Sequence, residues 1–291
     1  MKRRFFFLFI FIFPAITFSQ INVRMGSMMD PVKYEALDEG ALRVFYESKS
    51  VRDTTNPERT SIDYMVLDIG EKGISRFYSD NRRRTDSIMN ELIKGGGPVN
   101  IDRNLLSNNG ISSPGDSKEV LKNFPSGKIS VTDRIANSDY LYEENKNLFQ
   151  WQIETDTREI LSYTCQKAVT DFRGRHYEAW FAPDLPINDG PWKFSGLPGL
   201  ILAIEDSDKH FMFQAVGIEN YKKPVEYPKR DYVKTSRKEV EKIQKRFNDD
   251  PAGYLTNSTP GARVLIKMID QNGVERTGSE VKLPYNPIEL E

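Results

Sequence analysis

The feature that most constrains this fold is a cluster of glycine and proline around two large aromatic residues, followed at once by apolar residues. Residues 190–202 read Gly-Pro-Trp-Lys-Phe-Ser-Gly-Leu-Pro-Gly-Leu-Ile-Leu. Leu200 to Ile204 has no polar alternation, which predicts a β-strand that is buried on both faces. Pro198 and Gly199 suit the second and third positions of a type II turn, because glycine accepts a positive φ there. The rest of the chain must therefore cover this strand on both sides.

The segment between Phe181 and Gly199 shows little strand or helix periodicity. Ordered loops longer than about 12–15 residues are uncommon, and they are usually functional or packed against the protein. One interpretation is a structural plug, in which Trp180 and Trp192 are core aromatics. The other is a lid or mouth of a cavity inside the sheet, with a polar rim. The candidate binding residues for that second interpretation are Lys167, Arg175, Trp180, Trp192, Lys193 and Phe194.

Alternating polar and apolar residues predict many short strands joined by tight turns. The predicted strands are 42–47, 62–69, 74–78, 128–135, 140–142, 148–154, 160–172, 176–181, 200–204, 210–218, 264–269 and 280–283. Short connections between successive strands favour antiparallel meander pairing. A single antiparallel sheet of this length must curl or fold on itself. We therefore expect a mainly β (α+β) fold, with a strongly curved antiparallel meander sheet or half-barrel and one or two peripheral helices.

Two segments have helical spacing. Residues 86–94 place apolar side chains on one side, and the glycines at 95–97 end the pattern. Ser236 and Glu239 form a capping-box pattern before a second apolar stripe. That helix is expected to stop near Asp250-Pro251, because proline is poorly tolerated in a helix interior.

The first residues have the three-part pattern of a secretory signal peptide. Lys2, Arg3 and Arg4 precede an apolar stretch over residues 5–13, and small residues precede a predicted cut between Ser19 and Gln20. The stretch is shorter than the ~20 residues that span a bilayer. We therefore expect a signal peptide at 1–19, one domain at 20–291 without a transmembrane segment, and a periplasmic location.

Composition and short motifs exclude several classes of function. The chain has 41 Lys+Arg against 42 Asp+Glu, which argues against a nucleic-acid partner. We find no phosphate loop, dinucleotide fingerprint or nucleophile elbow. One cysteine, Cys165, and two histidines are too few for a standard zinc site. Cys165 lies in a strand-like stretch typical of a buried residue. The sequence thus predicts no cofactor, no metal site and no catalytic residue.

Several of these segments together resemble the GLPGLI family of exported Bacteroidota proteins, also called the Porph_ging family. The stretch Cys165-Gln166-Lys167-Ala168 is similar to one of its strands, and residues 67–70 and 77–79 are similar to its early hairpin. The signature residues, which we interpret as structural, are Cys165, Gly190, Pro191, Gly196, Leu197, Pro198, Gly199, Leu200 and Ile201. The resemblance implies export and a genomic association with TonB-dependent outer-membrane receptors. It implies no catalytic residues.

Three functions follow as hypotheses. The first is a non-enzymatic periplasmic binding or accessory protein that docks on a TonB-dependent receptor or another envelope protein. The second is a carrier that holds an apolar or peptidic ligand in the curved sheet. The third, supported only by the compartment, is an envelope hydrolase. The first two are favoured together.

Overall fold

The computed structural model describes residues 32–94, 103–111, 113–258, 266–269 and 274–291. These residues fall into two compact units. The larger unit runs to Lys245 and includes Pro284–Glu291, and the smaller unit is Arg246–Leu283. The predicted signal peptide and its cut between Ser19 and Gln20 lie outside the described residues. The single domain at 20–291 stays a prediction.

One sheet of twelve strands dominates the larger unit, in the order β14-β7-β6-β5-β4-β3-β2-β12-β11-β10-β9-β8. The first run of strands is β2 (Gly40–Val51), β3 (Thr60–Gly70), β4 (Ser75–Ser79), β5 (Glu119–Lys122), β6 (Lys128–Ile135) and β7 (Ser138–Asn145). The second run is β8 (Gln152–Ile160), β9 (Tyr163–Phe172), β10 (Arg175–Ala182), β11 (Leu200–Asp206) and β12 (Phe211–Asn220). The short strand β14 (Tyr232–Lys234) completes the sheet.

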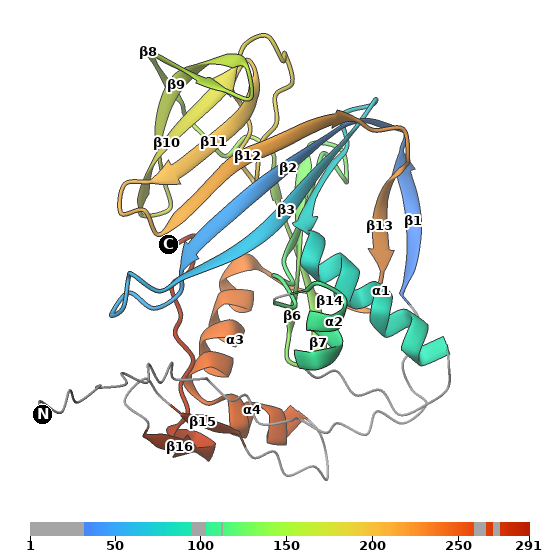
Figure 1. Ribbon diagram of the computed structural model, residues 1–291, viewed down its shortest axis with the longest axis vertical. Coiled ribbons are helices and arrows are strands. Elements are labelled where there is room, and N and C mark those ends of the chain that lie inside the picture. The colour runs from blue at the N-terminus through green and yellow to red at the C-terminus, as the bar shows by residue number, and fades with distance from the viewer. Residues whose placement is uncertain (1–31, 95–102, 112, 259–265, 270–273) are drawn as a thin grey trace, which may run out of the picture. The chain divides into compact units, whose positions relative to one another are not determined.

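The sheet consists of two meanders that join where β2 pairs with β12 (Figure 1). Pairing is antiparallel throughout except between β14 and β7, which are parallel. The sheet is open, with β14 and β8 as its two edges. On the β8 edge, the pairing with β9 shifts register between Ile153 and Thr157. The prediction of a mainly β fold with a large antiparallel sheet and few helices is therefore confirmed.

The remaining elements are short. In the larger unit, a two-stranded sheet pairs β1 (Lys33–Asp38) with β13 (Val225–Lys229), and the helices are α1 (Asp80–Lys94), α2 (Arg103–Asn108) and the start of α3 (Arg237–Asp249). The smaller unit holds the end of α3, α4 (Pro251–Ser258), the pair β15 (Lys267–Ile269) and β16 (Glu275–Thr277), and a 3-10 turn at Gly278–Glu280. None of the described helices is both long and apolar enough to cross a membrane.

Both predicted helices are present, and their starts follow from local hydrogen bonds. The Ser236 hydroxyl accepts a hydrogen bond from the Glu239 amide at 3.3 Å, as the capping pattern predicts. Helix α1 begins at Asp80, earlier than expected. The reason is a cap at Ser79, whose hydroxyl accepts a hydrogen bond from the Arg82 amide at 3.1 Å.

Four strand predictions were wrong, two in their boundaries, one in the existence of the strand and one in its place in the main sheet. Residues 160–172 form the end of β8 and all of β9, because Leu161 and Ser162 take positive φ values of 49° and 66° and reverse the chain. The strand expected from residue 148 begins only at Gln152. Residues 280–283 form no strand, and residues 267–269 pair outside the main sheet; residues 264 and 265 lie outside the described part of the chain.

The predicted burial of β11 is confirmed. All five residues from Leu200 to Ile204 are no more than 4% exposed. The neighbouring core includes a row of edge-to-face aromatic contacts from Tyr46 to Phe77 to Phe213, with ring centroids 6.1 and 5.8 Å apart. The Tyr46 hydroxyl donates a hydrogen bond to the Ile201 carbonyl at 2.7 Å, so even this polar group is satisfied inside the core.

The predicted type II turn at Pro198-Gly199 was wrong. The positive φ in this part of the loop belongs to Gly196, at 105°. Gly199 is required for a different reason, since a Cβ atom there would lie 2.2 Å from the Ala182 carbonyl oxygen. The glycine thus allows the two ends of the 183–199 loop to approach each other at the entry to β11.

We predict that Gly199→Ala lowers the free energy of unfolding by more than about 2 kcal/mol, because backbone must move to relieve the contact. Gly217→Ala in β12 is the matched control, since its Cβ would make only an ordinary 3.5 Å contact with Phe45. Chemical denaturation of the two variants measures the difference. Equal stability of both variants would contradict this role of Gly199.

Candidate functional site

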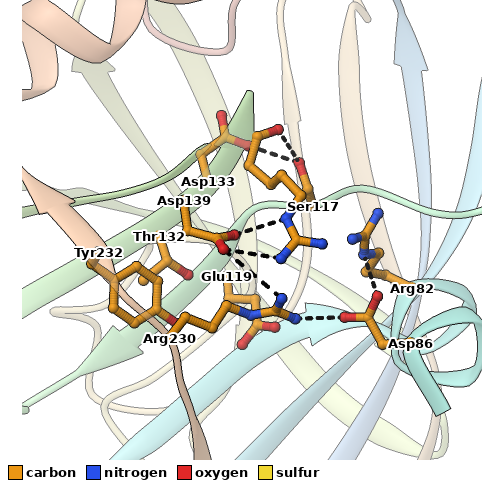
Figure 2. A pocket seen from close by; sticks show the side chains of 10 residues that line it. Arg82, Asp86, Ser117, Glu119, Thr132, Asp133, Asp139, Arg230 and Tyr232 are labelled. Atoms are coloured by element: carbon orange, nitrogen blue, oxygen red, sulfur yellow. Dashed lines mark hydrogen bonds and ion pairs between the residues drawn. The ribbon is translucent and has the colours of Figure 1, made fainter. Parts of the chain in front are cut away.

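The candidate site is a polar pocket between α1, the strands β5 to β7 and the segment before β14 (Figure 2). Its cavity volume is about 10 Å³, close to the size of one water molecule. We call it the arginine–carboxylate pocket. It is lined by Arg82, Asp86, Ser117, Glu119, Thr132, Asp133, Arg134, Asp139, Arg230 and Tyr232.

Arg230 joins the two sides of this pocket. Its Nη2 atom lies 2.7 Å from Asp86 Oδ2 on α1, and its Nη1 atom lies 4.0 Å from Asp139 Oδ2 on β7. Asp86 also pairs with Arg82 one helical turn away at 3.1 Å. Asp139 accepts two 2.9 Å hydrogen bonds from Arg134, in a bidentate pair across the β6–β7 hairpin. Burial lowers the pKa of Arg134, but this hydrogen bonding raises it above its usual value overall.

The other two carboxylates also have fixed partners. Asp133 accepts a 2.8 Å hydrogen bond from Ser117 and lies 3.2 Å from the Lys118 ammonium. Glu119 accepts a 2.8 Å hydrogen bond from Nε of the buried Arg76. Every carboxylate of the pocket is therefore held in place by a cation.

This arrangement suits the recognition of a neutral, hydroxyl-rich group. Guanidinium groups only donate hydrogen bonds, and ionised carboxylates only accept them. A hydroxyl group does both, and the cavity is of the right size for one hydroxyl or one water. Tyr232 adds an aromatic ring to the lining, and it stacks on Tyr227 with ring centroids 5.7 Å apart.

The 183–199 loop packs into the larger unit. Trp192, Phe194 and Leu197 are at most 6% exposed. The ring of Phe194 lies 5.1 Å from that of Phe149 and 4.9 Å from that of Tyr177, measured between centroids. These contacts fit the plug interpretation of the loop.

Polar anchors also hold the loop. Lys122 of β5 lies 2.5 Å from Asp189 and donates a hydrogen bond to the Gly190 carbonyl. The Trp151 indole donates a 2.9 Å hydrogen bond to the Ser195 carbonyl. Lys193 is fully buried, and its ammonium lies 2.6 Å from Glu144 of β7. The loop therefore contacts strands from both meanders.

The residues predicted for ligand binding fall into three places. Lys167 and Trp180 lie side by side on β9 and β10, both joined to Glu178, at 2.8 and 3.0 Å respectively. Trp192, Lys193 and Phe194 are consecutive residues of the buried loop. Arg175 lies on β10 and is buried in an ion pair with Asp206 at 2.7 Å. The structure thus does not bring the six residues together, and ligand binding by them stays a prediction.

The signature residues cluster around β11 and the loop that precedes it. Cys165 is buried in β9, and burial raises the pKa of its thiol to about 11. Gly190 packs against Ile201, where an added Cβ would lie 2.8 Å from the Ile201 side chain. Gly196, Leu197 and Pro198 line an open hollow of about 420 Å³ with Pro186 and Asn188. This hollow has no ionisable side chain, so it offers no acid–base chemistry.

One group of potential metal ligands occurs in the described part of the chain. Oxygen and nitrogen atoms of Asp206, Asp208 and His210 lie within 4.8 Å of one another. However, Asp206 already pairs with Arg175 and accepts a 2.7 Å hydrogen bond from the Phe211 amide. A metal ion would have to compete with the guanidinium for this carboxylate.

Sequence reasoning missed the arginine–carboxylate pocket. Its residues come from α1, β5, β6, β7 and the segment around β14, and they form no local motif. The available signal was the density of charge within strands: Asp133 and Arg134 lie inside β6, which is mostly buried, and Asp133 is only 4% exposed. Charged residues of both signs usually belong to a solvated surface, so this signal does not by itself indicate a buried site.

Comparison with known proteins adds three findings. A family model described as "N-glycanase peptide, N-terminal domain" matches residues 108–246, slightly less than half of the chain. A search of curated proteins finds no match. Among solved structures, two of PNGF-II match with TM-scores of 0.47 and 0.45, at 12% and 13% identity.

Each of these matches covers 70% of this chain, which spans about a third of the PNGF-II chains, 32% and 33% respectively. Likenesses this distant do not define the fold or the activity of this chain.

The family match overturns two predictions. It includes residues 165 to 201, on which the resemblance to the GLPGLI family depended, and it assigns them to a different family model. That resemblance was wrong, and the association with TonB-dependent receptors that it implied has no remaining support. The favoured function, a non-enzymatic binding or accessory protein, was also wrong, because an N-glycanase is a glycan-cleaving hydrolase.

We predict that Glu144 contributes to acid sensitivity. Burial raises the pKa of its carboxyl, but hydrogen bonds from Arg173 and Lys193 and the Lys193 charge bring it below the usual 4.5 overall. Its ionised form therefore stabilises the fold above about pH 4.5, and this contribution is lost as the pH falls through the lowered pKa.

Glu144→Gln should lower the free energy of unfolding at pH 7 by about 1.5–3 kcal/mol, and it should weaken the dependence on pH below 4.5. Chemical denaturation from pH 3 to 7 measures both effects. Glu143→Gln, at the exposed neighbouring position, is the control and should change neither. An unchanged acid dependence in Glu144→Gln would contradict the assignment.

Proposed function

We propose that this chain acts in the cleavage of N-linked glycans from glycoproteins, as an exported hydrolase or as the glycan-recognition domain of one. The observation that carries this proposal is the N-glycanase family match together with the place of the pocket. Eight of the ten pocket residues, from Ser117 to Tyr232, lie within the matched residues 108–246.

The chemistry of the arginine–carboxylate pocket supports glycan recognition. Sugars present hydroxyl groups that donate and accept hydrogen bonds, and the pocket offers both kinds of partner in a fixed array. Fixed partners lower the entropy that is lost on binding. The pairs Arg134–Asp139 and Arg230–Asp86 would hold their geometry before a sugar arrives.

We assign recognition and not water activation to this pocket. Hydrolysis needs a general base that takes a proton from water in the reaction. Asp86 and Asp139 each face two cations, and proton uptake by either would weaken these ion pairs. The proposal therefore leaves the hydrolytic step to groups outside the pocket.

A strongly curved sheet is part of this proposal. Lys193 pairs with Glu144 of β7, and the next residue, Phe194, packs on Tyr177 of β10. These strands are eight positions apart in the sheet, or roughly 38 Å in a flat sheet at about 4.8 Å per strand. Two adjacent residues do not span such a distance. A sheet that curves around the loop explains both contacts, and we also propose a periplasmic location for the folded chain.

We predict that the protein binds or releases N-glycans and that Asp139 matters for this. Asp139→Asn keeps the shape of the side chain but removes the charge that orders Arg134, and we expect at least tenfold weaker glycan affinity, or about 1.4 kcal/mol. Asp184→Asn, at an exposed loop position, should bind normally. Calorimetric titration with free N-glycans measures affinity, and mass spectrometry of a treated glycoprotein measures release.

Circular dichroism of both variants shows whether they are folded. Arg134→Lys serves as a second variant if Asp139→Asn does not fold, and it should also weaken glycan binding, because it keeps the positive charge but loses the bidentate pair with Asp139. The proposal fails if the unaltered protein neither binds free N-glycans nor releases them from a glycoprotein.

A further inference from the structure

Residues 284–291 return to the larger unit after the chain has left it at residue 246. We call this segment, with sequence Pro-Tyr-Asn-Pro-Ile-Glu-Leu-Glu, the 284–291 strap. It contains no helix and no strand. Its residues from Asn286 to Leu290 are hydrogen-bonded to the larger unit.

The side chain of Asn286 fixes the start of the strap. The Asn286 carboxamide oxygen accepts a 2.7 Å hydrogen bond from Arg175 Nη2. Its nitrogen donates a 2.7 Å hydrogen bond to the Val51 carbonyl at the end of β2. Both halves of the carboxamide are therefore recognised, which neither aspartate nor leucine would allow.

The backbone of the strap is also hydrogen-bonded to the larger unit. Arg175 Nη2 also donates to the Pro287 carbonyl at 2.8 Å, and the Tyr177 hydroxyl donates to the Ile288 carbonyl at 2.8 Å. The Leu290 amide donates to the Arg173 carbonyl at 2.9 Å. These contacts come from side chains of β10 and from the turn before it, so the strap lies against this end of the β9–β10 hairpin and adds no strand to the sheet.

Glu289 is the most deeply placed residue of the strap, with 4% of its surface exposed. Its carboxylate lies 2.6 Å from the Lys193 ammonium, pairs with Arg173 and lies 3.6 Å from Arg237 Nε. Glu144 faces the same three cations. Without Glu289, Arg173 and Lys193 would share Glu144, and Arg237 would keep its second partner, Glu241, so the pocket would lose one of its two central carboxylates.

Little apolar surface holds the strap. Glu289 is its one buried residue, and Leu290 is 53% exposed. Segments with few buried apolar contacts open at a lower free energy than the core does. The strap is thus bound in a sequence-specific way by charge and hydrogen bonds, while remaining separable from the sheet.

We propose that Arg173, Arg175, Tyr177, Lys193 and Arg237 form a peptide-binding groove, and that the 284–291 strap is its displaceable intramolecular occupant. The groove takes an extended peptide with asparagine followed three residues later by glutamate. When the strap leaves, the groove becomes free for another peptide. This inference does not depend on glycan cleavage.

The test uses the full chain with Asn286→Ala and Glu289→Gln together, which weakens its own strap. A fluorescent peptide with the sequence of residues 284–291 is then titrated, and anisotropy is measured. We expect at least tenfold tighter binding to this double variant than to the unaltered chain. A peptide carrying the Glu289→Gln change should lose that binding. Glu291→Gln in the full chain is the control, because Glu291 is exposed and the charge change is the same.

A second measurement needs no variant. In hydrogen exchange on the unaltered protein, the Leu290 amide should exchange faster than the amides of β9 and β10, and at a rate insensitive to mild denaturant. Exchange of Leu290 only with global unfolding would overturn the proposal. A folded double variant that does not bind the peptide would overturn it as well.

Discussion

The buried ion pair between Lys122 and Asp189 is the interaction on which much of the larger unit depends. Burial lowers the pKa of Lys122, and the Asp189 charge opposes that shift. Removing one partner would leave an unpaired charge in the core, which is strongly destabilising. Because Lys122 belongs to one meander and Asp189 to the loop that enters the other, this pair joins the two halves of the sheet. The aromatic side chains of the loop then pack in positions that the pair has already fixed.

Strand periodicity was a reliable guide where one face of a strand is more buried than the other, as in β2 and β12. The unbroken apolar run of β11 also indicated its burial on both faces. The turn at Leu161 and Ser162 was missed because leucine is not a typical turn former and no glycine or proline marks the turn. The positive φ values of the two residues depend on the pairing of β8 with β9. Gly199 was recognised as necessary, although for a positive φ and not for the close approach to Ala182.

The candidate site was much harder to foresee than the strands. Lysine is almost always solvated, so the complete burial of Lys193 was not predictable without knowledge of Glu144 and Glu289, residues from distant parts of the chain. The arginine–carboxylate pocket has the same origin, since Arg230 lies 144 residues from its partner Asp86. Short motifs report local chemistry, and in this protein the charged groups meet only through the tertiary fold.

The open edge at β8 has a consequence for how the protein behaves at high concentration. An unpaired edge strand is a template on which another chain can add, and aggregation follows. Most residues of β8 are exposed, and they include Asp156, Arg158 and Glu159. The register shift between Ile153 and Thr157 also breaks the regular row of backbone groups. The sheet therefore ends in a strand that discourages further strands, and it can stay open without growing from one molecule into the next.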